Sequence, residues 1–493
     1  MSVAEVVPSP AQPPDGVGDA AAEPVVGKLA AQVARRIETD IIGRGWPVGE
    51  SLGSEPELRE RYGVSRSVLR EAVRLVEHHQ VARMRRGPNG GLFIAAPDAG
   101  PAARAMVIYL EYVGTSVDDL MQARRLLEPL AAGLAATRVT EKGIELIRVT
   151  RDAETTSSDS PGDSVEDLHL ILGELSANPV LQLFIDVLIR LTTRYAAGPE
   201  HAPQSAYRKA RAEARRYHAD IAEAVIAGDA GRAEALLAEY LDGVLTWMRS
   251  NRRSGARSEE TITHRPADQD PRAKLAEVVA GALRDDIVAA GWPVGTVIGS
   301  ESDLLERYGI SRAVLREAVR LLEYHSVASM RRGPGGGLVV GIPDPQASID
   351  TMALYLEYRK VTAQDLLSVR EAVELGLITR VTARSDDPAI AAQLEAAIRW
   401  GSEWPDDDPA RSDLFHTELA GLAGNPVLAL FLRILTELWH RHAAGRRPTD
   451  RTAATATVEH VHRRIAEAVL AGDDGLARHR LRRHLEALTE WWH

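Results

Sequence analysis

The first strong pattern of apolar and polar positions predicts two short helices joined by a tight turn. Ser54 and Glu57 form a capping box, in which each side chain satisfies a free backbone amide at the start of a helix. Gly63 suits the left-handed turn that ends this helix. Ser65 then caps a second helix, residues 66–79, whose apolar positions form one stripe. The stripe consists of Val68, Leu69, Ala72, Val73 and Val76.

The pattern changes after this helix-turn-helix. The stretch "VARMRRGPNGGLFIAAP" alternates around a Pro-Asn-Gly-Gly turn, which predicts a two-stranded β-wing. After Pro97, and again after Pro343, apolar residues return at three- and four-residue spacing. That spacing predicts an almost continuously helical bundle.

The whole pattern occurs twice in the chain. Its second copy lies about 246 residues after the first, as several near-identical stretches show. These are "GWPVG" at Gly45 and Gly291, "MRRGPNGGL" at Met84 and "MRRGPGGGL" at Met330, "YLEY" at Tyr109 and Tyr355, and "NPVL" at Asn178 and Asn425. The repeat therefore covers a multidomain half rather than one motif.

We predict a mainly α-helical protein with two winged helix-turn-helix domains, which have small β-wings and are each followed by an all-α bundle. The N-terminus is rich in Pro and Ala and lacks a basic region before an apolar core, so it resembles a disordered tail rather than a secretory signal. A polar stretch between the halves has the character of a linker. The predicted parts are the tail 1–24, winged helix 25–97, bundle 98–249, linker 250–271, winged helix 272–343 and bundle 344–493.

Composition narrows the class of protein. The 493 residues are too many for one core, and the absence of cysteine excludes disulfides, thiol catalysis and cysteine-based zinc sites. We expect a cytoplasmic protein without a membrane partner, because no apolar run approaches the roughly 18 residues of a membrane span. The net charge of −11 requires any DNA-binding face to be local.

Such a local basic face is present in each half. Residues 61–86 contain seven arginines and two acidic residues, and residues 307–332 contain six and two. Arg66, Arg70 and Arg74 lie one helical turn apart on one exposed face. For a single helix, a solvated charged face would be the favoured explanation of this pattern. The joint recurrence of caps, turn, wing and basic charge favours double-stranded DNA as the partner.

The stretch "VGESLGSEPELRERYGVSRSVLREAVRLVE" resembles the winged helix of the GntR family of bacterial transcription regulators. The resemblance implies that the arginines at the start of each second helix read the major groove and that a wing glycine approaches the minor groove. The implied DNA contacts are Arg66, Ser67, Arg70, Arg74, Arg85, Arg86, Gly90, Arg312, Arg316, Arg320, Arg331, Arg332 and Gly336. The family usually has Arg after its Ser-Glu pair, whereas this chain has Pro56 and Ser302, so one customary contact is missing twice.

The helical halves resemble the FCD effector domain of the FadR subfamily, through stretches such as "LHLILGELSANPVL" and "DLFHTELAGLAGNPVL". Many such domains hold a divalent metal with one Asp and three His and use it to bind a carboxylate. In the second half the implied ligands are Asp413, His416, His462 and His484, and imidazoles suit Zn or Ni. The family's acidic ligand normally lies four residues before the first His, where this chain has Ser412. Buried His–carboxylate pairs without metal are the alternative.

The first half departs further from the ligand pattern. Its alignment gives Glu166, His169 and His218, with Tyr240 in place of the last His, which favours an empty or altered pocket. We therefore expect one module to sense a ligand and the other to act mainly as a scaffold.

One arginine in each bundle is a candidate for effector binding. Arg124 and Arg370 could pair with an effector carboxylate, or equally with Glu128 and Glu374 in structural ion pairs.

Together these features predict a DNA-binding transcription regulator and not an enzyme. We expect it to be a repressor that is controlled by a small carboxylate or acyl effector. One chain would act as a covalent pseudo-dimer on a palindromic operator, with further homodimerisation left open. The alternatives are a metal-dependent enzyme tethered to DNA by its winged helices and a non-specific architectural protein. The sequence shows no P-loop or dinucleotide fingerprint and no nucleophile or general base beside the histidines.

Overall fold

The computed structural model describes residues 25–87, 90–156, 167–195, 204–251, 271–333, 335–343, 345–403, 410–443 and 451–490. The chain divides into two compact units, residues 1–97 and 98–493. The predicted tail, residues 1–24, and most of the predicted linker lie outside the described residues. None of the helices in the described ranges is long and apolar enough to cross a membrane.

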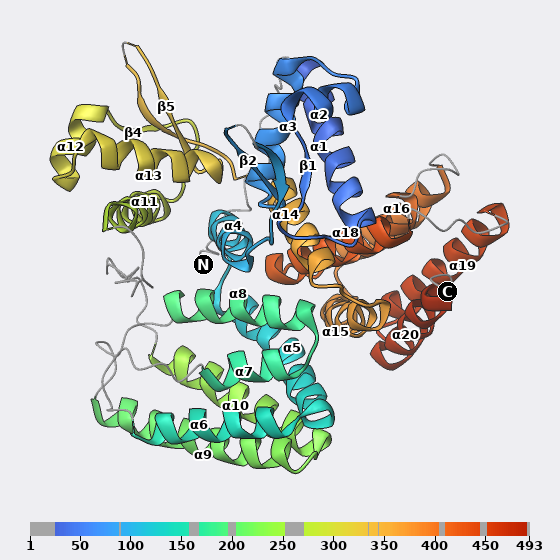
Figure 1. Ribbon diagram of the computed structural model, residues 1–493. Helices are drawn as coiled ribbons and strands as arrows, with labels where there is room; N and C mark the ends of the chain where they lie inside the picture. Colours follow the sequence, from blue (N-terminus) through green and yellow to red (C-terminus); the bar gives the residue numbers. More distant parts are fainter. Residues whose placement is uncertain are drawn as a thin grey trace, which may run out of the picture. The chain divides into compact units, whose positions relative to one another are not determined.

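The first unit is a winged helix of three helices and three strands, called here the first winged helix (Figure 1). Its elements are α1 (Val25–Gly43), β1 (Ser51–Gly53), α2 (Glu55–Tyr62), α3 (Arg66–His78), β2 (Ala82–Arg85) and β3 (Gly91–Ile94).

Local sequence signals explain where α2 and α3 begin and end. The carboxylate of Glu57 accepts the backbone amide of Ser54 at 2.7 Å, and Gly63 ends α2 with a φ of 65°. The side chain of Ser65 accepts the Val68 amide at 3.4 Å and caps α3. All five residues of the predicted apolar stripe of α3 are buried, so the predicted helix-turn-helix is confirmed.

The wing contains one more strand than the sequence pattern predicts. β3 pairs antiparallel with β2, as expected, but its other edge pairs with β1, giving the order β1-β3-β2. The added strand is three residues long, so it is too short to show an alternating pattern of its own. It places Leu52 in the core beneath the wing.

The second unit contains a helical module, a winged helix and a second helical module. The first helical module consists of α4 (Ala99–Tyr112), α5 (Val117–Arg138), α6 (Glu141–Thr156), α7 (Asp167–Leu175), α8 (Pro179–Tyr195), α9 (Gln204–Ile226) and α10 (Ala230–Asn251). The second winged helix consists of α11 (Pro271–Ala289), β4 (Val297–Gly299), α12 (Glu301–Tyr308), α13 (Arg312–Tyr324), β5 (Ala328–Arg331) and β6 (Gly337–Val340). The second helical module consists of α14 (Pro345–Tyr358), α15 (Ala363–Thr382), α16 (Pro388–Glu403), α17 (Ala410–Leu422), α18 (Pro426–Ala443), α19 (Arg451–Leu470) and α20 (Asp474–Glu490).

The second winged helix repeats the local structure of the first. Ser300 and Asp303 form a complete capping box at the start of α12, and Gly309 ends that helix with a φ of 60°. Ser311 caps α13 through the Val314 amide. The sheet order is β4-β6-β5, the counterpart of the first wing.

The two helical modules share one hydrophobic core. The core joins buried residues of α4, α5 and α8 to buried residues of α14, α15 and α18. At its centre the rings of Phe184 and Phe431 stack with centroids 3.9 Å apart and planes inclined by 13°. Each ring lies six residues after the Asn of an NPVL motif, so the two phenylalanines are equivalent positions of the repeat. Contact between equivalent residues is the signature of a local two-fold axis.

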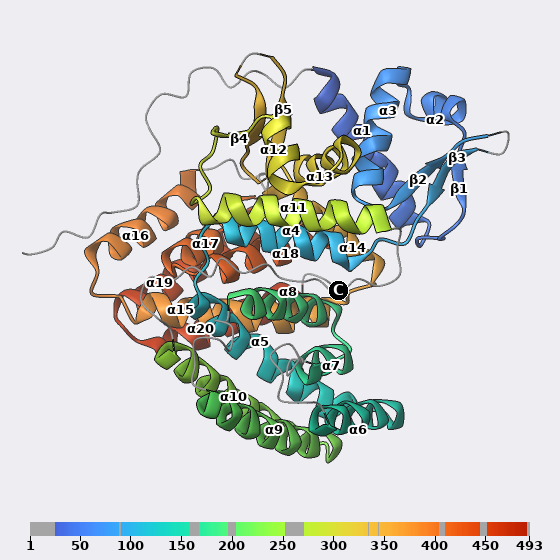
Figure 2. The ribbon, with the colours of Figure 1, turned by 90° about the vertical axis from the view of Figure 1, so that its left-hand side faces the viewer.

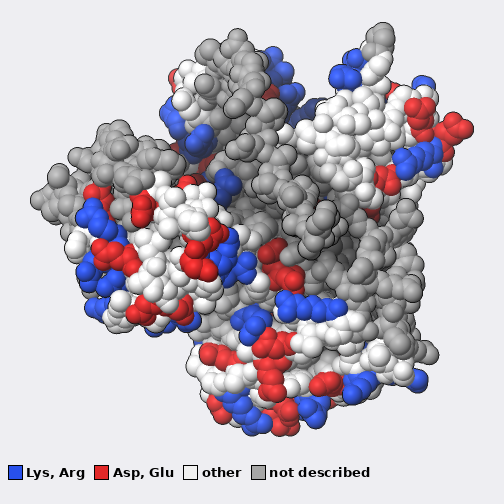
Figure 3. All heavy atoms as spheres, turned by 180° about the vertical axis from the view of Figure 1, so that it is seen from behind, with Lys and Arg blue, Asp and Glu red and all other residues white. Residues whose placement is uncertain are grey.

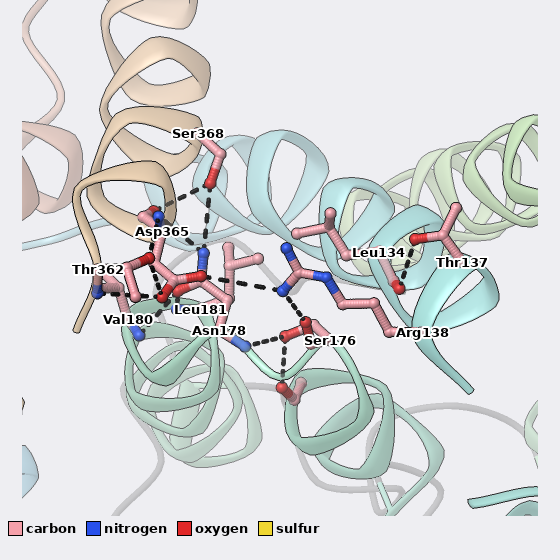
Figure 4. Close-up of polar contacts among 11 residues, drawn as sticks. Leu134, Thr137, Arg138, Ser176, Asn178, Val180, Leu181, Thr362, Asp365 and Ser368 are labelled. Carbon is pink, nitrogen blue, oxygen red and sulfur yellow. Dashed lines mark hydrogen bonds and ion pairs between the residues drawn. The ribbon is translucent and has the colours of Figure 1, made fainter. Parts of the chain in front are cut away.

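Two asparagines extend the same pairing to the polar edge of the interface. The side-chain amide of Asn178 donates to the Asp365 carbonyl oxygen at 3.0 Å and to Ser368 Oγ at 3.3 Å (Figure 4). Asn425 donates to the carbonyl oxygen of Asp119 at 3.2 Å, which is the reciprocal contact. Each asparagine oxygen also accepts two backbone amides at the start of the helix that follows it. The NPVL motif therefore caps a helix and joins the modules at once.

The stacked pair predicts where the bundle is most sensitive to truncation. Phe184→Ala should lower the free energy of unfolding of the helical unit by about 3–5 kcal/mol, because it removes a fully buried ring and leaves a cavity. Urea unfolding followed by circular dichroism measures the loss. Val149→Ala is the control, since Val149 is 60% exposed and should change stability by about 0.5 kcal/mol or less. Similar losses in the two variants would contradict a shared core centred on Phe184.

Candidate nucleic-acid interface and metal centre

The arginines predicted to contact DNA lie on the solvent face of α3 and α13. The side chains of Arg66, Arg70 and Arg74 are 61%, 60% and 75% exposed. In α13, Arg312 and Arg320 are 77% and 73% exposed. This exposure follows from helix geometry, because the apolar stripe opposite them is buried in each winged helix.

An acidic residue from the preceding helix contacts this arginine face in both winged helices. Glu55 lies 2.5 Å from Arg66 Nε and 3.8 Å from Arg70 Nε, and Glu301 lies 3.7 Å from Arg312 Nε. Exposed ion pairs of this kind contribute only about 0–1 kcal/mol, so phosphate groups can displace them at small cost. The sequence pattern did not identify these pairs, because the partners belong to different helices.

The predicted wing residues surround a tight turn. Arg85 lies over the Phe93 ring at 4.3 Å, and Arg331 donates to the Gly335 carbonyl oxygen at 3.1 Å. A Cβ atom at Gly90 or Gly336 would collide with the backbone oxygen of the arginine five residues earlier. These glycines therefore have a structural reason to be small, in addition to any approach to DNA.

The remaining predicted contacts are also at the surface. Ser67, Arg86, Arg316 and Arg332 are exposed, and the Ser67 hydroxyl lies 3.0 Å from that of Ser65. Basic and acidic side chains are interspersed on the face shown in Figure 3, and the whole chain has a net charge of −11. The arginine clusters on α3 and α13 are thus local features of an acidic protein.

Three histidines converge inside the second helical module. His416 of α17, His462 of α19 and His484 of α20 are buried, and their ligand atoms all lie within 4.8 Å of one another. The Nε2 atoms of His462 and His484 are 3.1 Å apart, and those of His484 and His416 are 3.3 Å apart. Three imidazole nitrogens this close together form a donor set that could hold a metal ion.

The surroundings of these histidines favour the neutral imidazole form, which can bind a metal ion. Burial, followed by the nearby His416, lowers the pKa of His462 well below its ordinary value and that of His484 to about 3. Both imidazoles are therefore neutral at neutral pH, which is the form that binds metals. Glu374 Oε2 lies 2.5 Å from His416 Nδ1, so the other ring nitrogen of His416, Nε2, faces the cluster.

A buried arginine fixes this orienting carboxylate. Arg370 Nε donates to Glu374 at 2.6 Å, and both side chains are almost fully buried. Burial raises the pKa of Glu374, but the charges of His416 and Arg370 outweigh it and hold the pKa at about 2. Arg370, predicted to be an effector ligand, thus lies in an ion pair behind the histidines.

Asp413, predicted to be the acidic ligand, is buried on α17 one turn before His416. Its carboxylate lies 2.5 Å from His440 Nε2 of α18. Hydrogen bonding to Asp413 raises the pKa of His440 and favours its charged form. Among the described residues, the converging group comprises the three histidines alone. The sequence did not predict the His440 pair, because no local pattern connects the two helices.

The first helical module keeps half of this arrangement. Arg124 and Glu128 form a buried ion pair at 2.5 Å, and Glu128 binds His169 Nδ1 at 2.5 Å. His169 and His218 face each other with their Nε2 atoms 3.3 Å apart. The ring of Tyr240 lies 4.9 Å from that of His218.

An acidic side chain of α6 completes this first cluster. Glu154 lies 2.9 Å from His218 Nδ1, so each of the two histidines has a carboxylate partner. Glu166, the acidic residue suggested by alignment, lies outside the described residues. In the described part of this module, no three histidine or carboxylate side chains bring their ligand atoms together.

Two sequence profiles match the chain, each of them twice. The profile described as "Bacterial regulatory proteins, gntR family" matches residues 29–93 and 275–338. The FCD domain profile matches residues 119–243 and 365–487. The two winged helices and the two helical modules thus each contain one matched region.

Several known regulators are similar to parts of the chain. The Uxu operon regulator of Haemophilus influenzae is 29% identical over 32% of this chain and 59% of its own length. A putative L-lactate dehydrogenase operon regulatory protein of Escherichia coli is 29% identical over 50% of this chain and 96% of its own length. The transcriptional repressor NanR of Escherichia coli is 24% identical over 45% of this chain and 84% of its own length. Half of this chain is therefore enough to match nearly the whole of the L-lactate dehydrogenase operon regulatory protein, as expected if the chain is duplicated.

The difference between the two modules predicts an unequal metal content. The chain dialysed against Zn²⁺ or Ni²⁺ should retain about one ion, and His462→Gln should retain almost none, because two imidazoles alone bind weakly. Elemental analysis after desalting measures the ratio. His218→Gln in the first module is the matched control and should leave the ratio unchanged. A wild-type chain that retains no ion, or an equal loss in His218→Gln, would contradict this assignment.

Proposed function

Because the chain belongs to the gntR family of bacterial regulatory proteins and carries two FCD domains, we propose that it binds one palindromic operator as a covalent pseudo-dimer. The family is one of DNA-binding transcription regulators, so the enzyme alternative is set aside. The observation that carries the proposal is the stacking of equivalent phenylalanines, Phe184 and Phe431, between the helical modules. Two copies that pair about a local two-fold axis supply within one chain what a homodimer obtains from two.

The two recognition helices have nearly the same exposed residues. Arg66, Arg70 and Arg74 in α3 correspond to Arg312, Arg316 and Arg320 in α13, whereas Ser67 is replaced by alanine. Arg side chains near the start of such a helix can donate two hydrogen bonds to a guanine edge. The proposal therefore includes two half-sites of nearly identical sequence, arranged as an inverted repeat.

The second helical module is the proposed sensor. Its three histidines would hold a divalent metal, Zn or Ni, with Asp413 as the fourth ligand after its release from His440. A metal held there would supply a positive charge that attracts a carboxylate group. Glu374 and Arg370 hold the His416 ring in the required orientation. Arg370 could bind an effector directly only if its ion pair with Glu374 opened.

The first helical module is proposed to act mainly as a scaffold. Its Arg124, Glu128 and His169 repeat the orienting ion pairs, but Tyr240 stands where the third histidine would be. The fully paired cluster stabilises the bundle without requiring a metal.

A small organic acid or acyl compound is the proposed effector, and the proposed outcome is relief of repression. Names of similar regulators support this choice, since one refers to an L-lactate dehydrogenase operon and another is a repressor. Binding in the second module would favour one of two arrangements of the winged helices over the other. The free energy of DNA binding would then change by no more than the difference between the effector's binding free energies for the two arrangements.

Selection of binding sites from a random pool of DNA duplexes tests the proposed mode of recognition. Wild-type protein should enrich an inverted repeat with two similar half-sites. A variant with Arg66, Arg70, Arg312 and Arg316 changed to Ala should enrich none, because it lacks the groove-reading side chains. Each lost contact to a base should cost about 1–3 kcal/mol.

A variant with the same loss of charge serves as the control. Arg148, Arg232, Arg463 and Arg464 are exposed on the helical modules, and their replacement by Ala should leave the enriched motif unchanged. If the recognition-helix variant enriched the same motif as wild type, or if wild type enriched single half-sites only, the proposal would fail.

A further inference from the structure

Two helices at equivalent positions of the repeat lie against each other where the helical modules meet. α5 of the first helical module lies beside α15 of the second (Figure 2). In this contact Arg380 donates a hydrogen bond to the side-chain oxygen of Gln122. Four residues further along α5, Leu126 lies against Gly376, which is four residues before Arg380 in α15. A forward step in one helix therefore matches a backward step in the other, so the two helices run antiparallel.

The two sides of this contact differ in the size of their side chains. Leu126 of α5 is the counterpart of Ala372 in α15, 246 residues later. Leu130 is likewise the counterpart of Gly376. The antiparallel register places Leu130 opposite Ala372, just as Leu126 lies opposite Gly376, and both leucines pack against the shared core. Each pair therefore joins a large side chain of the first module to a small residue of the second.

Gly376 shows how closely the two helices fit. The three atoms nearest to a Cβ added at Gly376 all belong to Leu126, and one of them, a methyl carbon, would collide with it. At Gly243, in the interior of α10, an added Cβ would meet nothing within 4 Å among the described residues. Glycine in a helix interior is less favourable than alanine, because it loses more backbone freedom on folding. The glycine at position 376 thus weakens its own helix but leaves the space that Leu126 occupies.

Two like modules would not fit together in this register. Two first modules would bring Leu126 of one against Leu130 of the other, twice, which overfills the contact. Two second modules would bring Ala372 of one against Gly376 of the other, twice, which leaves space unfilled. Only the mixed pair places one large and one small residue at each contact.

We propose that the contact between α5 and α15 makes each helical module selective for the opposite half and unfavourable for a copy of itself. Such selectivity comes from the poor fit of the like pairs as much as from the good fit of the mixed pair. Two chains therefore do not assemble by pairing like modules, and membership of one chain favours the mixed pair within it. This selectivity does not depend on how the winged helices bind DNA, so unfolding without DNA tests it separately from the selection of operator sites.

Adding one methyl group at Gly376 tests the fit, with urea unfolding of the full chain followed by circular dichroism. Gly376→Ala should lower the urea midpoint of the wild-type chain, because the new methyl group collides with Leu126. In a chain that already carries Leu126→Ala it should raise the midpoint, because only the better helix propensity of alanine remains. Gly243→Ala is the matched control and should raise the midpoint in both backgrounds. A shift of the same direction for Gly376→Ala in both backgrounds would overturn the proposal.

Exchanging the large and small sides tests the selectivity itself in the same full chain. Ala372→Leu with Gly376→Leu gives both helices large side chains, as in a pair of first modules. Leu126→Ala with Leu130→Ala gives both helices small ones, as in a pair of second modules. Each double variant should unfold at lower urea concentration than wild type. The chain with all four changes should unfold at higher urea concentration than either double variant, because large and small residues face each other again. Double variants as stable as wild type, or a fourfold variant no more stable than either of them, would overturn the proposal.

Discussion

The burial of equivalent faces of two helical modules against each other is the constraint on which the rest of the structure depends. Phe184 and Phe431 stack at the centre, and Asn178 and Asn425 exchange equivalent hydrogen bonds at the edge. Neither face could remain exposed without a large apolar surface in water. The duplication therefore makes each helical module the permanent partner of the other, because both belong to one chain and share one core.

A permanent partnership permits the two halves to diverge in their interiors. Both modules keep the buried chain of arginine, glutamate and histidine, because an incomplete network of buried charges would be costly. The two modules differ in the residue that follows this series of contacts: the second module has His484, and the first has Tyr240. The contacts that Asn178 and Asn425 make between the helical modules are thus equivalent in the two halves, whereas the buried histidine clusters are not.

Local signals in the sequence predicted the parts of the fold that local physics determines. Helix caps at Ser65 and Ser311, the turn glycines and the periodic apolar stripes all act within a few residues of each other, and the repeat made each signal visible twice. The histidine cluster was predicted by resemblance and not by spacing. Contacts between distant segments were missed, among them β1 with β3, Asp413 with His440 and Glu154 with His218. No periodicity records which helices become neighbours, so such pairs emerge only from the folded chain.

The mass of the protein–DNA complex tests the central claim most directly. Mass photometry or native mass spectrometry would be applied to the wild-type chain bound to a duplex that carries one complete inverted repeat. A pseudo-dimer predicts one chain per duplex, with loss of the complex when either half-site is scrambled. A complex of two chains on one inverted repeat, each still bound when one half-site is scrambled, would contradict the account, because each chain would then use only one winged helix.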